Sequence, residues 1–80
     1  MVIEYDPVGV CSKHFTIEVE DGVIRRLDFV GGCHGNLQGI AALLRGMAVS
    51  EAVSRLEGIC CRQKPTSCPD QLAQALKQAL

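Results

Sequence analysis

The stretch of sequence that decides the fold is residues 15–29, FTIEVEDGVIRRLDF. Apolar and polar residues alternate on both sides of Asp21-Gly22, a dipeptide typical of a tight turn. This pattern predicts two antiparallel strands joined as a β-hairpin. Residues 2–6 are also suited to a strand, which must end at Pro7. The first third of the chain therefore predicts a sheet of three strands.

The register of the hairpin has two candidates. A two-residue loop would place Phe15 opposite Asp28 and would mix apolar and polar residues on one face. A three-residue loop places Phe15 opposite Leu27, and it places His14 opposite Asp28 on the polar face. Because a slip of one residue moves every side chain to the other face, we predict the three-residue loop. Two residues remain on the wrong faces in this register, Ile24 and Arg25.

Three helices are predicted after the hairpin. Asn36 is the expected N-cap of the first, whose apolar stripe runs from Leu37 to Met47. Ser50 is the expected cap of a short second helix over residues 51–56. The third begins at Ser67, with Asp70 three residues later as in a capping box, and its apolar stripe runs from Leu72 to Leu80. Three strands followed by three helices predict one α+β domain over residues 1–80, a three-stranded antiparallel sheet with helices packed on one face.

Composition narrows the class of protein. The chain is 48% hydrophobic and 21% charged, which excludes a disordered protein. Its net charge is −1 and its basic residues are scattered, which argues against a nucleic-acid partner. The sequence has no signal peptide at its start and no apolar run long enough for a membrane span, so we expect a cytoplasmic protein. In that compartment five cysteines, an odd number, indicate metal ligands or redox thiols rather than disulfides.

Four of these cysteines lie near the ends of predicted elements. Extending the hairpin pairing outward places Cys11 opposite Gly31, close to Cys33 at the same end of the hairpin. Cys33 precedes the first helix and Cys68 lies in the first turn of the third, and positive helix ends favour thiolates. A short loop joins Cys61 to Cys68. Each cysteine could instead be a small buried apolar residue, but four at such junctions favour a shared metal site.

Two motifs resemble a known family. Residues 66–70, TSCPD, and residues 32–40, GCHGNLQGI, are similar to the TSCPD domain family, which is named for the first motif. That family occurs as small stand-alone proteins and as a C-terminal region of adenosylcobalamin-dependent ribonucleotide reductases. Its four-cysteine pattern falls on Cys11, Cys33, Cys61 and Cys68, and Cys60 lies outside it. The resemblance implies a metal-binding domain that is accessory to ribonucleotide reductase and DNA synthesis.

A fainter similarity links the chain to NifU/IscU-type iron–sulfur scaffolds and implies an IscU-like fold. Three scaffold cysteines match Cys11, Cys33 and Cys68. The scaffolds have an aspartate where this chain has Lys13, and a histidine where it has Ser67. A site that lacks these oxygen and nitrogen ligands but gains a fourth thiol suits zinc or a permanent iron–sulfur cluster.

We therefore predict a cysteine-rich domain that binds zinc or an iron–sulfur cluster, with a reductase or the iron–sulfur machinery as its protein partner. One alternative is a thiol redox module in which Cys61 and Cys68 cycle between dithiol and disulfide. The other is an iron–sulfur scaffold or carrier. No hydrolytic triad is evident, and eighty residues are too few to enclose cobalamin and nucleotide sites, so no autonomous active site is predicted. Two further residues, His34 and Cys60, remain open as additional ligands.

Overall fold

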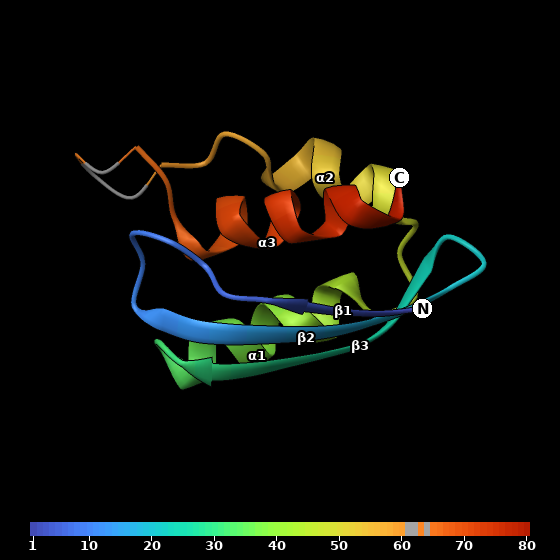
Figure 1. The fold of residues 1–80 in the computed structure, drawn as a ribbon, viewed down its shortest axis with the longest axis horizontal. Helices are drawn as coiled ribbons and strands as arrows, with labels where there is room; N and C mark the ends of the chain where they lie inside the picture. Colours follow the sequence, from blue (N-terminus) through green and yellow to red (C-terminus); the bar gives the residue numbers. More distant parts are fainter. Residues whose placement is uncertain (61–62, 64) are drawn as a thin grey trace.

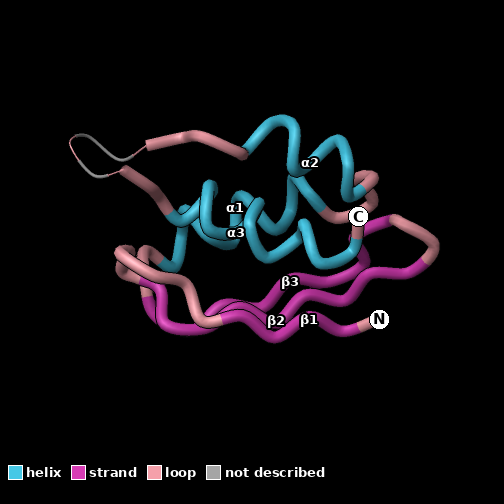
Figure 2. The backbone as a smooth tube through the Cα atoms, turned by 45° about the horizontal axis from the view of Figure 1, so that its top comes forward, coloured by secondary structure: helices cyan, strands magenta, loops and turns pink. Residues whose placement is uncertain are grey.

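The fold is a three-stranded sheet covered by helices. The computed structural model describes residues 1–60, 63 and 65–80. The elements, in chain order, are β1 (Val2–Tyr5), β2 (Ser12–Glu20), β3 (Val23–Gly31), α1 (His34–Leu44), α2 (Val49–Leu56), α3 (Cys68–Leu76) and the 3₁₀ segment η1 (Lys77–Ala79). The sheet is antiparallel in the order β1-β2-β3, and the helices lie on one side of it (Figure 2). The predicted α+β class and layer arrangement are confirmed.

The turn between β2 and β3 has two residues, so the predicted three-residue loop is wrong. Glu20 pairs with Val23, which leaves Asp21 and Gly22 as the turn. Their φ angles are 53° and 74°. Positive φ at both central residues is typical of a type I′ turn, whose twist matches that of the flanking strands.

A β-bulge at Arg25 reconciles this short turn with the alternating strands. Val19 pairs with Ile24, but its neighbour Glu18 pairs with Arg26, so Arg25 is an extra residue in β3. Ile24 is fully buried, whereas Arg25 is exposed. The bulge therefore explains why Ile24 and Arg25 did not fit the predicted register: it turns Ile24 towards the core and Arg25 towards solvent.

Beyond the bulge, the pairing differs from the prediction by two residues and keeps the predicted faces. Phe15 lies opposite Phe29 rather than Leu27, and both Phe15 and Leu27 are buried. His14 lies opposite Val30, not Asp28. At the outer end, a second register shift lies between Ser12 and His14, so Ser12 rather than Cys11 is the partner of Gly31, a difference of one residue.

The first two helices begin earlier than predicted. Cys33 is the N-cap of α1, and Asn36 lies in its first turn. Ala48 rather than Ser50 is the N-cap of α2, because the Val49 amide donates to the carbonyl of Gly22 in the hairpin turn. The chain thus enters α2 from an edge of the sheet. No helix among the described residues is long and apolar enough to span a membrane.

The ends of α1 and α3 also fall short of their predicted apolar stripes. Helix α1 ends at Leu44, which leaves Met47 outside it, and Gly46 follows with a φ of 90°. Helix α3 ends at Leu76, and Leu80 is 70% exposed. The predicted stripe of α3 is therefore buried only in its first part.

The core lies between the sheet and the helices. Phe15 is fully buried, and its ring lies 5.2 Å from that of Phe29 and 6.3 Å from that of Tyr5. These three are all the aromatic residues of the chain, so its largest side chains form one cluster. The buried aliphatic side chains around it include Ile3, Ile17, Ile24, Val49, Leu72 and Leu76.

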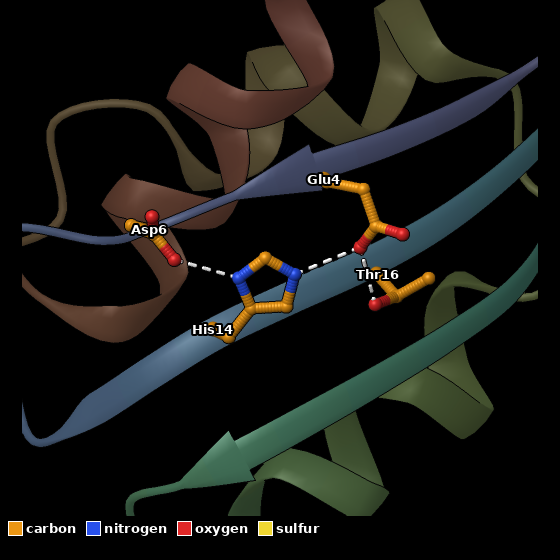
Figure 3. Close-up of polar contacts among 4 residues, drawn as sticks. All are labelled: Glu4, Asp6, His14 and Thr16. Atoms are coloured by element: carbon orange, nitrogen blue, oxygen red, sulfur yellow. Dashed lines mark hydrogen bonds and ion pairs between the residues drawn. The ribbon is translucent and has the colours of Figure 1, made fainter.

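The opposite face of the sheet carries a polar cluster around His14 (Figure 3). The Nδ1 atom of His14 lies 2.6 Å from an Asp6 oxygen, and Nε2 lies 2.8 Å from Oε1 of Glu4. Thr16 donates to the same Glu4 oxygen over 2.7 Å. The pKa of His14 is raised, first by Asp6 and then by Glu4, which both stabilise the protonated ring. The pKa of Glu4 is lowered, first by Thr16 and then by His14.

This cluster gives a test of the register. We expect Asp6→Asn to lower the pKa of His14 towards its ordinary value of 6.5, and Glu4→Gln to lower it by less. Because folding raises this pKa, the contribution of His14 to stability is present below the unfolded pKa and is lost as pH rises through the folded one. NMR titration of the imidazole measures both shifts. Asp28→Asn is the control, and a larger shift from it than from Asp6→Asn would contradict the observed register.

Candidate functional site

One open hollow of about 580 Å³ brings together three of the four predicted ligands. Cys11 immediately precedes β2, Cys33 caps α1, and Cys68 is the first residue of α3. These element starts lie at the end of the sheet away from the hairpin turn (Figure 1). The other lining residues are Gly35, Asn36, Leu37, Gly39, Ile40, Leu43 and Pro69. We call this the thiol hollow.

The sulfurs of the thiol hollow are accessible but do not form a preassembled ligand set. Cys11 and Cys33 are exposed, Cys68 is half-buried, and all three are free thiols. Over residues 1–60, 63 and 65–80, no three Cys, His, Asp or Glu side chains lie close enough together to hold a metal ion. The fourth predicted ligand, Cys61, lies outside the described residues.

The two additional candidates lie elsewhere. Cys60 is exposed, and its sulfur is 3.5 Å from the carbonyl oxygens of Gly58 and Pro65. His34 lines a separate hollow between α1 and β3, and its Nε2 is 2.9 Å from Nε2 of Gln38. Neither Cys60 nor His34 is among the residues that line the thiol hollow.

The start of α3 is held by its own motif. Ser67 is the N-cap, as predicted: its hydroxyl accepts from the Asp70 amide at 3.1 Å and donates to the carbonyl of Ile59 at 2.5 Å. The Asp70 carboxylate instead accepts from the Gly58 amide at 2.8 Å and from the Thr66 hydroxyl at 2.5 Å. Asp70 therefore ties the end of α2 to the start of α3 rather than closing a capping box.

Gln71 makes a second set of bonds from the same turn of α3. Its Oε1 accepts from the Tyr5 hydroxyl at 3.2 Å and from the Val8 amide at 3.0 Å. Its Nε2 donates to the Thr66 hydroxyl at 3.0 Å. The loop that leads to Cys11 is thus fastened to the helix that begins at Cys68. The sequence alone does not reveal this role of Gln71, because a glutamine just after the TSCPD motif carries no sign of its distant partners.

These hydrogen bonds also favour the ionised form of Asp70. Its pKa is lowered, first by the Thr66 hydroxyl and then by the Gly58 amide, because both donate to the carboxylate. Asp70 is only 7% exposed, so the carboxylate depends on these donors in place of water.

Fold and hollow together define a small α+β domain with three free thiols at one end. A family model, described as TSCPD domain, matches residues 2–80. The chain therefore belongs to the TSCPD domain family, as its motifs indicated. Comparisons with curated proteins and with solved structures find no match. The expected likeness to NifU/IscU-type scaffolds is accordingly not confirmed.

The Asp70 contacts predict a loss of stability on mutation. Asp70→Asn replaces one acceptor oxygen by an amide that faces donors, so we expect it to lower the free energy of unfolding at neutral pH by about 1–3 kcal/mol. Because the folded pKa is depressed, this contribution is lost as pH falls through the folded pKa, and the two proteins should converge in acid. Urea denaturation across pH measures both effects. Asp28→Asn, at an exposed carboxylate 2.8 Å from Arg26, is the matched control, and an equal effect from it would contradict the assigned role.

Proposed function

We propose that this domain binds zinc or an iron–sulfur cluster through Cys11, Cys33, Cys61 and Cys68. The observation that carries the proposal is that three of these thiols line one hollow although they are far apart in the sequence. Thiolates are the ligands that both zinc and iron–sulfur clusters take. Cys61 enters the proposal through the family pattern and its position in the sequence.

The cysteine thiols suit zinc or an iron–sulfur cluster both in their chemistry and in the accessibility of their sulfurs. Cys68 is anchored at the start of α3, whereas the Cys11 and Cys33 side chains are exposed at the ends of loops. Ligation requires these exposed side chains to turn towards Cys68, because no described set of three donors lies at ligand spacing. The predominantly apolar wall of α1, with Leu37, Ile40 and Leu43, would limit access of water to the sulfurs.

The proposed role of the chain's own residues is to hold the thiols at the ends of three elements. Bound zinc would supply a cross-link, whereas an iron–sulfur cluster would supply electron transfer. A structural role is attractive in a chain of 80 residues, because domains this small often need more than their apolar core. An accessory role beside a ribonucleotide reductase belongs to the same proposal and is supported by the family resemblance.

The ligand assignment predicts unequal effects of serine substitutions. We expect Cys11→Ser, Cys33→Ser, Cys61→Ser and Cys68→Ser each to remove most of the bound metal, because each deletes one thiolate. Cys60→Ser is the matched control and should keep the metal content of the unmodified protein. Elemental analysis of protein purified without oxygen measures the content. Equal losses from Cys60→Ser and Cys61→Ser would show that the assignment within this pair is wrong.

A second experiment separates a structural metal from a redox dithiol. We expect a strong chelator to lower the melting temperature of the reduced protein and added metal to restore it. A loss of ~2 kcal/mol lowers the midpoint of a domain this size by roughly 8–16 °C, and structural zinc contributes more than that in small domains.

Thiol counts complete this experiment. A dithiol module would keep the same melting temperature in the presence of the chelator. Mild oxidation would consume two of its thiols by joining Cys61 to Cys68. If the reduced protein melts at one temperature with and without chelator while metal analysis shows that the metal is gone, the metal cross-link is excluded.

A further inference from the structure

A buried serine, Ser12, contacts one of the thiols that line the hollow. It follows Cys11 directly and is the first residue of β2. Its hydroxyl oxygen lies 3.3 Å from the sulfur of Cys68, which is 56 positions away in the sequence. Ser12 is only 3% exposed. Among the described residues, the hydrogen bond to Cys68 is the side-chain bond that this buried hydroxyl makes.

The segment that leads to Cys33 passes close to the same Ser12 hydroxyl. A Cβ atom added to Gly32 would lie 2.5 Å from Oγ of Ser12 and 2.9 Å from Cδ1 of Leu37. Real Cβ atoms essentially never approach so closely, so a larger residue at this position would force the side chains of Ser12 and Leu37 to shift. Gly32 also has a φ of 79° and immediately precedes Cys33. The backbone that delivers Cys33 to the hollow therefore covers Ser12 and restricts where its hydroxyl can point.

We propose that Ser12 is a positioning residue for the proposed metal site: its buried hydroxyl donates a hydrogen bond to the Cys68 sulfur and fixes that sulfur on the wall of the hollow. This inference rests on the proposed function, since it names the group that orients one of the ligands. This role differs from that of the four cysteines, which the proposed function makes the ligands themselves. Ser12 is the residue that touches or adjoins all three described thiol segments, those of Cys11, Cys33 and Cys68.

The direction of the hydrogen bond follows from the chemistry of the sulfur. In the free thiol, either the hydroxyl or the S–H group can donate. A sulfur that binds a metal has lost its proton, so the serine hydroxyl must then be the donor. Such a bond draws electron density from the sulfur and holds its lone pairs in one orientation. Groups that hydrogen-bond to metal ligands in this way typically change metal affinity 10–100-fold when they are removed.

The test uses Co²⁺ as a spectroscopic probe in the full chain. Ser12→Ala removes the hydroxyl and almost no volume, and Ser54→Ala makes the same change at an exposed position on α2. We expect Ser12→Ala to weaken Co²⁺ binding 10–100-fold in competition with a chelator. We also expect its sulfur-to-cobalt charge-transfer band to move to lower energy, because a sulfur without the hydrogen bond gives up electrons more easily. Ser54→Ala should match the unmodified protein in both measurements.

A metal-free measurement keeps the inference separate from the proposed function. In a variant that retains only Cys68, with the other four cysteines changed to serine, the Raman S–H stretch reports the surroundings of this one sulfur. We expect Ser12→Ala to shift and broaden that band. Urea denaturation of each variant shows that it is folded before its spectrum is compared.

The outcomes distinguish the two proposals. If the unmodified protein binds no Co²⁺, the zinc form of the proposed function fails, and the Raman band alone decides whether Ser12 positions Cys68. If the protein binds Co²⁺ and Cys68→Ser weakens that binding, but Ser12→Ala changes neither the affinity nor the charge-transfer band, the role of Ser12 is overturned while the proposed function stands. An unchanged Raman band on Ser12→Ala overturns the hydrogen bond itself.

Discussion

The side-chain amide of Gln71 is the contact on which the arrangement of the thiols depends. It binds Tyr5 and Val8 through its oxygen and Thr66 through its nitrogen, so it joins the loop before Cys11 to the start of α3. Its neighbour Asp70 reaches Gly58 at the other side of the helix start. Both side chains are largely buried, and a buried polar group that loses its partner costs about 1–3 kcal/mol. Two consecutive residues of one helical turn thus fix the loop before Cys11 and the turn at Gly58 without any bond to a sulfur.

The hairpin shows how far alternation of apolar residues predicts a register. Alternation correctly assigned Phe15, Ile17 and Val19 to the buried face. It could not assign their partners, because a shift by two residues leaves every face unchanged. The sequence already indicated the bulge. Ile24 and Arg25 are adjacent and both break the alternation of apolar and polar residues, which is what one extra residue in a strand produces.

The start of a helix could be predicted from the sequence only where a capping side chain determines it. Ser67 caps α3 through its hydroxyl, as expected. Asn36 and Ser50 are equally good caps by type, but α1 and α2 begin before them without a side-chain cap. There the backbone decides: Gly31 and Gly32, both with positive φ, turn the chain out of β3, and the Val49 amide bonds to Gly22. Contacts of this kind lie outside local sequence preference.

The candidate site, too, could be predicted from the sequence only in part. Three of the four cysteines that the sequence places at the ends of elements line one hollow, because the ends of a hairpin and of the helices packed on it are few. Ser12 was not singled out, since its partner lies 56 residues away and serine is common at strand ends. Gln71 bonds to residues 63 and 66 positions away, and its amide carries no signal of that distance.

The exposure of the sulfurs argues against one of the two interpretations of these cysteines, that of a small buried apolar residue. A cysteine that serves as a small apolar residue should be buried, yet Cys11 and Cys33 are exposed and Cys68 is half-buried. None of these three cysteines belongs to the apolar core, which consists of the aromatic rings and the buried aliphatic side chains between sheet and helices. The backbone beneath the thiols is nevertheless firmly held, by Gln71, by Asp70 and by the close approach of Gly32 to Ser12. Packing alone gives no reason for accessible sulfurs on a constrained backbone, and this arrangement supports the proposed site.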